Sequence, residues 1–89
     1  MDENQTLDFK PRARGLIIGS TPWLARITDK ARAHLANRVG EYIYPCPADQ
    51  RFLQEMQLSA EEFTALVASC PDDDAVIAGM KAHLAGRSA

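Results

Sequence analysis

The chain has 89 residues, of which 46% are hydrophobic and 25% are charged, and its net charge is −2 at neutral pH. This composition excludes a disordered chain, and the length allows one domain that buries only about 60–65% of its surface, too little for a deep internal pocket. No apolar stretch approaches the roughly 20 residues that span a bilayer, so we expect no membrane-spanning segment.

Residues 1–20 contain Pro11, Gly15 and Gly19 and show no helical periodicity. They predict an irregular N-terminal arm that packs on a helical domain, residues 21–89. Leu16-Ile17-Ile18 is too apolar for free solvent, so we expect this run to be buried or to form an interface.

The first helix is expected to begin with Thr21 as its N-cap and Pro22 at its first position, where the missing N–H is not needed. Gly40 can take the left-handed conformation that ends such a helix. The spacing of the apolar residues predicts one buried stripe, made of Leu24, Ile27, Ala31 and Leu35.

The next segment predicts a stiff connector followed by a second helix. Tyr42-Ile43-Tyr44 has strand-like composition, but it is too short and too close to Pro45 to be more than an extended link. Pro47 suits the first position of a helix, which makes Cys46 its N-cap. That helix carries the apolar residues Phe52, Leu53 and Met56.

Two more helices follow. Ser59 and Glu62 have the spacing of a capping box, which predicts a third helix with its apolar stripe at Phe63, Leu66, Val67 and Cys70. The acidic run 72–74 suits the positive end of a fourth helix, which we expect to end at Gly86. The pattern predicts an all-α fold: a compact single domain of about four helices with an irregular N-terminal arm.

Several short motifs between about residues 10 and 80 also form a recognisable set. The most specific are Asp29-Lys30-Ala31-Arg32-Ala33 and Gly40-Glu41-Tyr42-x-Tyr44-x-Cys46-Pro47-x-Asp49. The set resembles a family of small bacterial proteins known only as a domain of unknown function. The resemblance implies a bacterial helical domain, and it brings no activity, cofactor or partner.

The one candidate for covalent chemistry is Cys46. A thiol at a helix N-terminus meets N–H donors and the positive end of the helix dipole, which favour the thiolate. His34 is the candidate base if the fold brings it close, whereas Asp49 competes for the same donors and disfavours a thiolate. The alternative is an inert thiol below the tyrosines, which is the commoner state of free cysteine.

Metal and cofactor sites are not expected. The histidines and cysteines match no zinc spacing, and no phosphate loop is present. The two cysteines form no CxxC pair and no secretory signal is visible, so we expect a cytoplasmic protein with reduced thiols.

The charges are unevenly distributed: residues 10–38 carry seven basic groups and one acid. Arg26, Lys30 and Arg32 are candidates for binding a phosphate or carboxylate. The alternative is a solvated face on which Asp29 pairs with its neighbours. Helix-turn-helix DNA binding is not expected, because the helix that would enter the groove begins Ala60-Glu61-Glu62 and would be repelled by phosphates.

Our leading hypothesis is a non-enzymatic protein-interaction or accessory module of a bacterial cytoplasm. It would bind a protein partner, or a second copy of itself, through residues 16–18 and the connector with Tyr42, Tyr44 and Cys46. A thiol-based enzyme or redox sensor centred on Cys46 is one alternative. A weak anion or nucleic-acid binder using the basic face of the first helix is the other.

Overall fold

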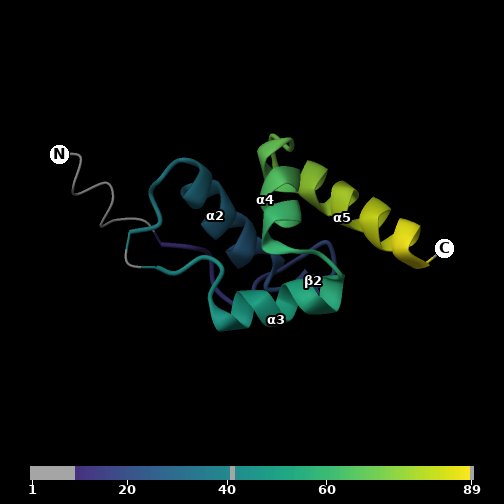
Figure 1. The fold of residues 1–89 in the computed structure, drawn as a ribbon, viewed down its shortest axis with the longest axis horizontal. Helices are drawn as coiled ribbons and strands as arrows, with labels where there is room; N and C mark the ends of the chain where they lie inside the picture. Colours follow the sequence, from purple (N-terminus) through teal and green to yellow (C-terminus); the bar gives the residue numbers. More distant parts are fainter. Residues whose placement is uncertain (1–9, 41, 89) are drawn as a thin grey trace.

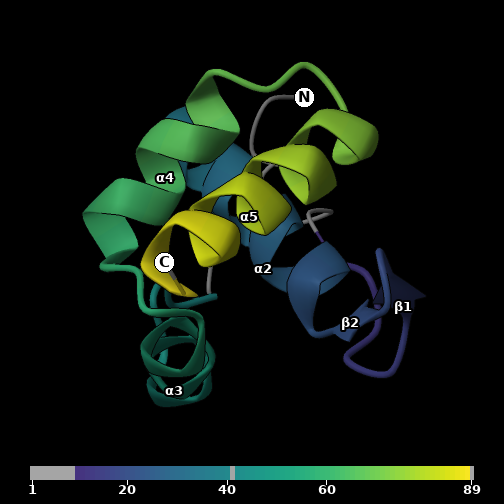
Figure 2. The ribbon, with the colours of Figure 1, turned by 90° about the vertical axis from the view of Figure 1, so that its right-hand side faces the viewer.

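A computed structural model describes residues 10–40 and 42–88 of the chain. Within these ranges α2 and α4 pack against each other, α3 packs on α4, and α5 packs on both α2 and α4 (Figures 1 and 2). The elements are β1 (Ile17–Ile18), β2 (Thr21–Pro22), α2 (Leu24–Leu35), α3 (Pro47–Met56), α4 (Ala60–Ala68) and α5 (Asp73–Ser88). A compact helical fold is confirmed, although the β1–β2 hairpin means that it is not strictly all-α.

The hydrophobic core lies between the facing sides of the four helices. Phe63 of α4, Ile27 of α2 and Val76 of α5 are fully buried in it. The predicted stripe of α2 is buried except for Leu35, which is 49% exposed because it lies in the last turn of the helix beside an open groove. The remaining core members are Leu24, Ala31, Phe52, Leu53, Val67 and Met80.

The start of α2 differs from the prediction. Thr21 is not an N-cap and Pro22 is not helical, because both lie in β2 and pair with Ile18 and Ile17 of β1. Residues 19 and 20 both have positive φ, at 55° and 60°, as a type I′ hairpin turn requires. Thr21 and Pro22, which were expected to start the helix, therefore form the second strand of the hairpin, and α2 begins two residues later than expected.

Helix starts were predicted better than helix ends. Cys46 caps α3 and Ser59 caps α4, as expected. Both form a capping box, which was predicted for Ser59 but not for Cys46, where Asp49 was expected only to compete for the same donors. Gly40 has positive φ but does not end α2, which stops at Leu35, and Gly86 lies inside α5.

The end of α2 is a Schellman motif built on Asn37. Its φ is 59°, its N–H donates to the carbonyl of His34, and the N–H of Arg38 donates to that of Ala33 at 2.7 Å. Gln57 plays the same part after α3, with φ of 61°. Polar residues thus take the left-handed position for which we had looked to glycine.

The arm is partly exposed. Leu16 and Ile17 are 43% and 59% exposed, whereas Ile18 packs against the core. Phe9, which was also expected to pack on the domain, lies with the rest of residues 1–9 outside the described residues. Of the apolar run only Ile18 is partly buried, and the expectation that Leu16 and Ile17 form an interface stays a prediction.

The hairpin turn gives a direct test of this fold. A Cβ added at Gly19 would lie 2.6 Å from Cγ2 of Ile77, at a φ that L-residues rarely adopt. Gly19→Ala should therefore lower the free energy of unfolding by about 1–3 kcal/mol, measured by urea denaturation. Gly15→Ala is the matched control, because a Cβ there meets nothing within 4 Å. Equal stability of the two variants would contradict the hairpin packing.

Candidate functional site

The charged residues of the Asp29-Lys30-Ala31-Arg32 motif connect α2 to other segments, and the deepest connection is made by Lys30. Its Nζ lies 2.6 Å from Oδ2 of Asp49 on α3, and the two side chains are only 3% and 0% exposed. Asp49 also accepts hydrogen bonds from Nε1 of Trp23 at 2.9 Å and from the backbone N–H of Cys46 at 3.0 Å. A buried carboxylate and a buried ammonium are thus paired, and the carboxylate is hydrogen-bonded on both oxygens.

A second network ties the arm to α2 and α5. Arg12 donates to both oxygens of Asp29, at 2.8 and 2.9 Å, and to both oxygens of Asp73, at 2.7 and 3.1 Å. Arg32 donates to Asp73 at 3.2 Å. The Asp29–Arg32 pair expected from helical spacing does not form, because Asp29 turns to Arg12 instead. The arm is therefore anchored at Arg12 on the start of α5 as well as on α2.

These contacts set the ionisation of the acids. Burial alone would raise the pKa of Asp49, but the hydrogen bonds from Lys30, Cys46 and Trp23 outweigh it and hold that pKa below its ordinary value. The hydrogen bond from Arg12, opposed by partial burial and helped by Arg32, likewise lowers the pKa of Asp73. Donation to Asp73 and Asp29 raises the pKa of Arg12 above its usual range. The charged forms are thus the ones that the fold stabilises.

The structure brings Cys46 and Asp49 together but leaves His34 elsewhere. Sγ of Cys46 accepts a 3.4 Å hydrogen bond from the N–H of Asp49, as a capping side chain does. The ring of His34 lies 5.4 Å from that of Tyr44, and within the described residues it makes no hydrogen bond to Cys46 or Asp49. The thiol therefore serves as a cap, and its neighbouring carboxylate is engaged by Lys30.

The basic residues of α2 are dispersed rather than gathered on one open face. Lys30 is buried on Asp49, and Arg32 pairs with Asp73. Arg26 donates to the carbonyl of Arg12 at 3.2 Å and lies over the rings of Trp23 and Tyr42, at 5.9 and 5.8 Å. Arg26 is thus the member of the predicted trio that no carboxylate holds among the described residues.

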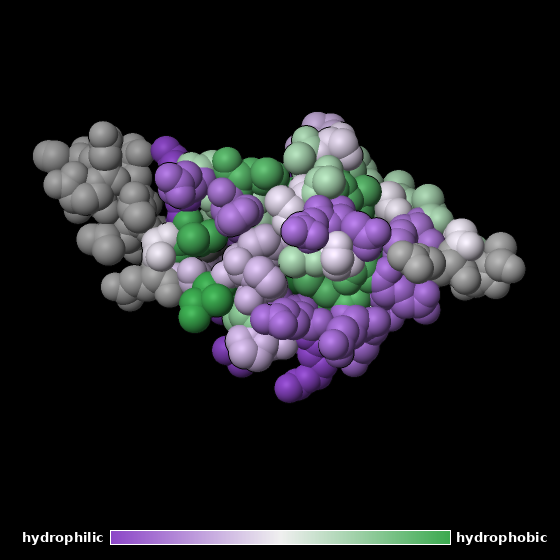
Figure 3. All heavy atoms as spheres, in the orientation of Figure 1, coloured by the Kyte–Doolittle hydropathy of each residue, from purple (hydrophilic) through white to green (hydrophobic). Residues whose placement is uncertain are grey.

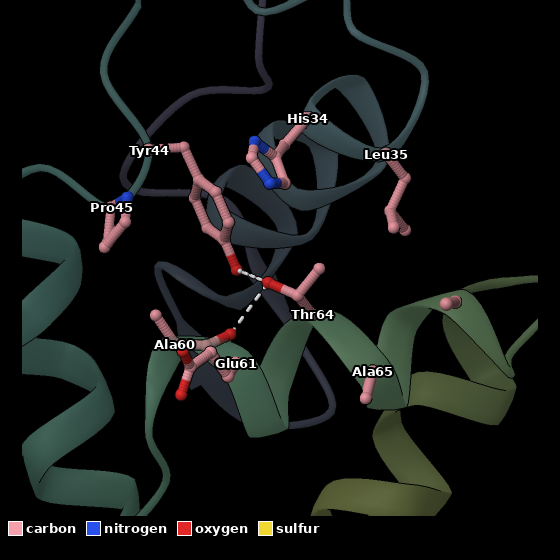
Figure 4. Close-up of a pocket in the computed structure, with 9 residues that line it drawn as sticks. His34, Leu35, Tyr44, Pro45, Ala60, Glu61, Thr64 and Ala65 are labelled. Atoms are coloured by element: carbon pink, nitrogen blue, oxygen red, sulfur yellow. Dashed lines mark hydrogen bonds between the residues drawn. The ribbon is translucent and has the colours of Figure 1, made fainter.

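An open groove of about 560 Å³ lies between the end of α2, the connector (residues 42–47) and α4 (Figure 4). The hydroxyl of Thr64 donates to the carbonyl of Ala60 at 2.7 Å, so the hydroxyl of Tyr44, 2.7 Å away, donates to Thr64. Burial is the main reason why the pKa of Tyr44 is raised, which keeps it a donor. The lining residues are His34, Leu35, Tyr44, Pro45, Ala60, Glu61, Thr64, Ala65 and Ala68.

A smaller pocket of about 310 Å³ lies beside Trp23. Sequence reasoning missed it, because Arg14 of the arm and Arg51 of α3 are 37 positions apart and only the folded chain brings both to its lining. It also missed the Lys30–Asp49 pair, although a signal existed. Lys30 lies three residues after Ile27 on the buried side of the helix, where a charge needs a partner.

Metal sites and membrane-spanning helices are both absent from the described residues. No group of three or more His, Cys, Asp or Glu side chains in ranges 10–40 and 42–88 is arranged to hold a metal ion. In the same part of the chain, no helix has the length and hydropathy needed to cross a bilayer.

The buried pair predicts an unusual pH dependence. Because the pKa of Asp49 is lowered in the folded protein, its ionised form adds to the free energy of unfolding at pH values above the pKa of aspartate in the unfolded chain, about 3.9. This stabilisation is lost as the pH falls below that value. Lys30→Met should lower the free energy of unfolding by about 3–5 kcal/mol at neutral pH, because it leaves a buried charge unpaired.

The difference in free energy of unfolding between Lys30→Met and the parent protein should become smaller towards about pH 4. Asp49 then becomes neutral in the variant, where no ammonium lowers its pKa, whereas in the parent protein its lowered pKa keeps it ionised and paired with Lys30. Urea denaturation across the pH range measures both curves, and Lys81→Met on the exposed face of α5 is the control. A constant offset between the curves would contradict the pairing.

The capping role of Cys46 can be tested with two substitutions at one position. Cys46→Ser supplies another good N-cap acceptor and should keep the stability of the parent, whereas Cys46→Ala should lower it by about 0.5–2 kcal/mol. Thermal denaturation compares them. If serine and alanine destabilise equally, the sulfur is not acting as a cap.

Comparison with known proteins agrees with the resemblance to a domain of unknown function. No curated protein matches the chain. A family model described as a domain of unknown function, DUF5069, matches residues 9–89. This match spans both charged networks, the groove and the pocket, and on its strength the chain belongs to the DUF5069 family.

Proposed function

We propose that this domain is a non-enzymatic protein-interaction module of a bacterial cytoplasm, and that its groove between α2, the connector and α4 receives a segment of a partner protein. The observation that carries the proposal is a preformed, mostly apolar groove whose walls are fixed by hydrogen bonds. The segment that fits it is amphipathic, with an apolar anchor flanked by lysine or arginine.

The shape of the groove supports an apolar anchor. Its α4 wall is made largely of small side chains, Ala60, Ala65 and Ala68, which leave room for a large side chain of a partner. Opposite them, Tyr44 is held by Thr64 and therefore presents a fixed ring face (Figure 4). A preformed site of this kind loses little entropy on binding, which favours recognition.

Exposed apolar residues at the same edge extend the surface. Leu35 lines the groove and is 49% exposed, and Ile43, next to Tyr44, is 66% exposed. Figure 3 shows that apolar residues reach this face of the molecule in separate patches between polar ones. Large apolar side chains left in water beside a groove are a usual mark of an interaction surface.

Charge selects the partner. Glu61 is the one carboxylate among the nine lining residues, and Glu62 follows it on α4. Both arginine and lysine side chains would gain attraction there, and acidic segments would be repelled. The groove therefore favours a basic flank next to the anchor.

A thiol-based enzyme, the first alternative, has less support. Such an enzyme needs a base at Cys46, but the ring of His34 lies against Tyr44 and the carboxylate of Asp49 is bonded to Lys30. Self-association would use the same apolar edge, and the measured mass in solution separates it from partner binding.

Selection of a displayed random peptide library on the folded domain tests the proposal. We expect enriched peptides to place an aromatic or aliphatic residue within a few positions of Lys or Arg. Ala65→Arg should fill the groove and weaken binding of the selected peptide by about tenfold or more. Glu61→Arg should reverse the charge preference towards acidic flanks, and Lys81→Glu on exposed α5 is the matched control.

Equal binding of the selected peptides to the parent protein and to Ala65→Arg would overturn the proposal, because such peptides do not occupy the groove. A stable dimer that dissociates in Ala65→Arg, seen by light scattering, would replace the partner with a second copy of the chain.

A further inference from the structure

The pocket beside Trp23 has features that the groove does not share. Trp23 precedes α2 with φ of 75° and ψ of −26°, a left-handed conformation that is strained for a bulky residue. Its indole N–H donates to the buried carboxylate of Asp49, which fixes the ring in place. Strain of this kind persists only where the surroundings enforce it, and it is concentrated at functional sites.

Two arginines that line this pocket, Arg14 and Arg51, differ from three basic residues of the charged networks. Arg12, Lys30 and Arg32 are each held by a carboxylate. Arg14 lies over the indole, 5.6 Å from its centroid, and Arg51 lines the same pocket from α3. Among the described residues, neither has a carboxylate within ion-pair distance, so their charges are open to an external anion.

The pocket combines these cations with an apolar wall. Its other lining residues are Pro22, Trp23, Ala48, Phe52 and Glu55. Its volume of about 310 Å³ is in the lower part of the range for small-ligand sites. An aromatic floor beside guanidinium groups is the chemistry that holds a flat ring together with a phosphate.

We propose that this pocket binds a nucleoside phosphate. The phosphate bridges Arg14 and Arg51, and the base packs on the apolar wall formed by Pro22 and Trp23. Arg26, which also lies over Trp23 at 5.9 Å, adds positive potential from α2. Free nucleotide and the end of a single strand of nucleic acid share this chemistry, and the experiment distinguishes them.

Glu55 is the one carboxylate of the pocket, and it opposes the phosphate. It lies four residues after Arg51 on α3, yet the two form no ion pair. A carboxylate at this rim instead accepts hydrogen bonds from sugar hydroxyls. This role predicts that Glu55→Gln weakens the binding of ribonucleotides more than the binding of inorganic phosphate.

The single tryptophan makes the test direct, because Trp23 is the only source of indole fluorescence. Titration of the full chain with AMP, a short uridine oligonucleotide and inorganic phosphate should give saturable quenching by the first two. AMP should bind at least about tenfold more tightly than phosphate alone, and added salt should weaken it. Comparable affinities for AMP and the oligonucleotide identify free nucleotide as the ligand, and a much tighter oligonucleotide identifies the strand.

Variants locate the site. Arg14→Gln and Arg51→Gln should each weaken AMP binding about tenfold, because each removes a charge-assisted hydrogen bond. Lys81→Gln and the groove variant Ala65→Arg should leave it unchanged, and calorimetric titration gives a readout independent of Trp23. Absence of saturable binding, equal affinity for AMP and inorganic phosphate, or insensitivity to Arg14→Gln and Arg51→Gln would each overturn the proposal.

Discussion

The buried ion pair between Lys30 and Asp49 is the constraint on which the rest of this small domain depends. Removing two charges from water is costly, and the pair is tolerated only because both partners and the surrounding donors are in place. Asp49 can accept from Trp23 and Cys46 only if α3 starts at one position relative to α2. The pair therefore fixes the start of α3, the ring of Trp23 and the direction of the connector together.

This constraint explains why α2 is the centre of the domain. Three charged residues of α2 reach three different segments: Asp29 the arm, Lys30 the start of α3, and Arg32 the start of α5. The outer pairs are partly exposed and individually weak, but Arg12 and Asp73 link them into one network. An 89-residue chain has a small apolar core, and these polar links set the positions of segments that hydrophobic contact alone would leave loosely defined.

The sequence predicted what depends on neighbouring residues and missed what depends on distant ones. The N-caps Cys46 and Ser59 were predicted because the residues that mark them are close in sequence: Pro47 follows the first, and Glu62 lies three positions after the second. The hairpin was missed because Thr21-Pro22 satisfies the rules for a helix start as well as those for a strand after a tight turn. Only the packing of Gly19 against Ile77 of α5, 58 positions away, decides between them.

For the candidate sites, too, the local sequence showed the residues but not their distant partners. Lys30 and Arg32 are visible as basic residues on one helix, whereas their acidic partners on α3 and α5 are not. An anion-binding face was therefore expected where ion pairs exist. Arg14 and Arg51, the two cations of the pocket beside Trp23, have no carboxylate partner among the described residues, and no local pattern connects them. Long-range pairing decides which charges remain available for a ligand.

The same pairing bears on the choice between binding and thiol chemistry. A reactive cysteine needs an accessible sulfur and a base that can take its proton. Here the sulfur accepts the N–H that a cap must satisfy, and the nearest carboxylate is bonded to an ammonium. Reactivity at Cys46 would require giving up a helix start and disturbing the buried pair, whereas the ligands proposed for the groove at Tyr44 and the pocket at Trp23 would leave both intact. This difference is the reason for proposing recognition at the surface rather than chemistry at Cys46.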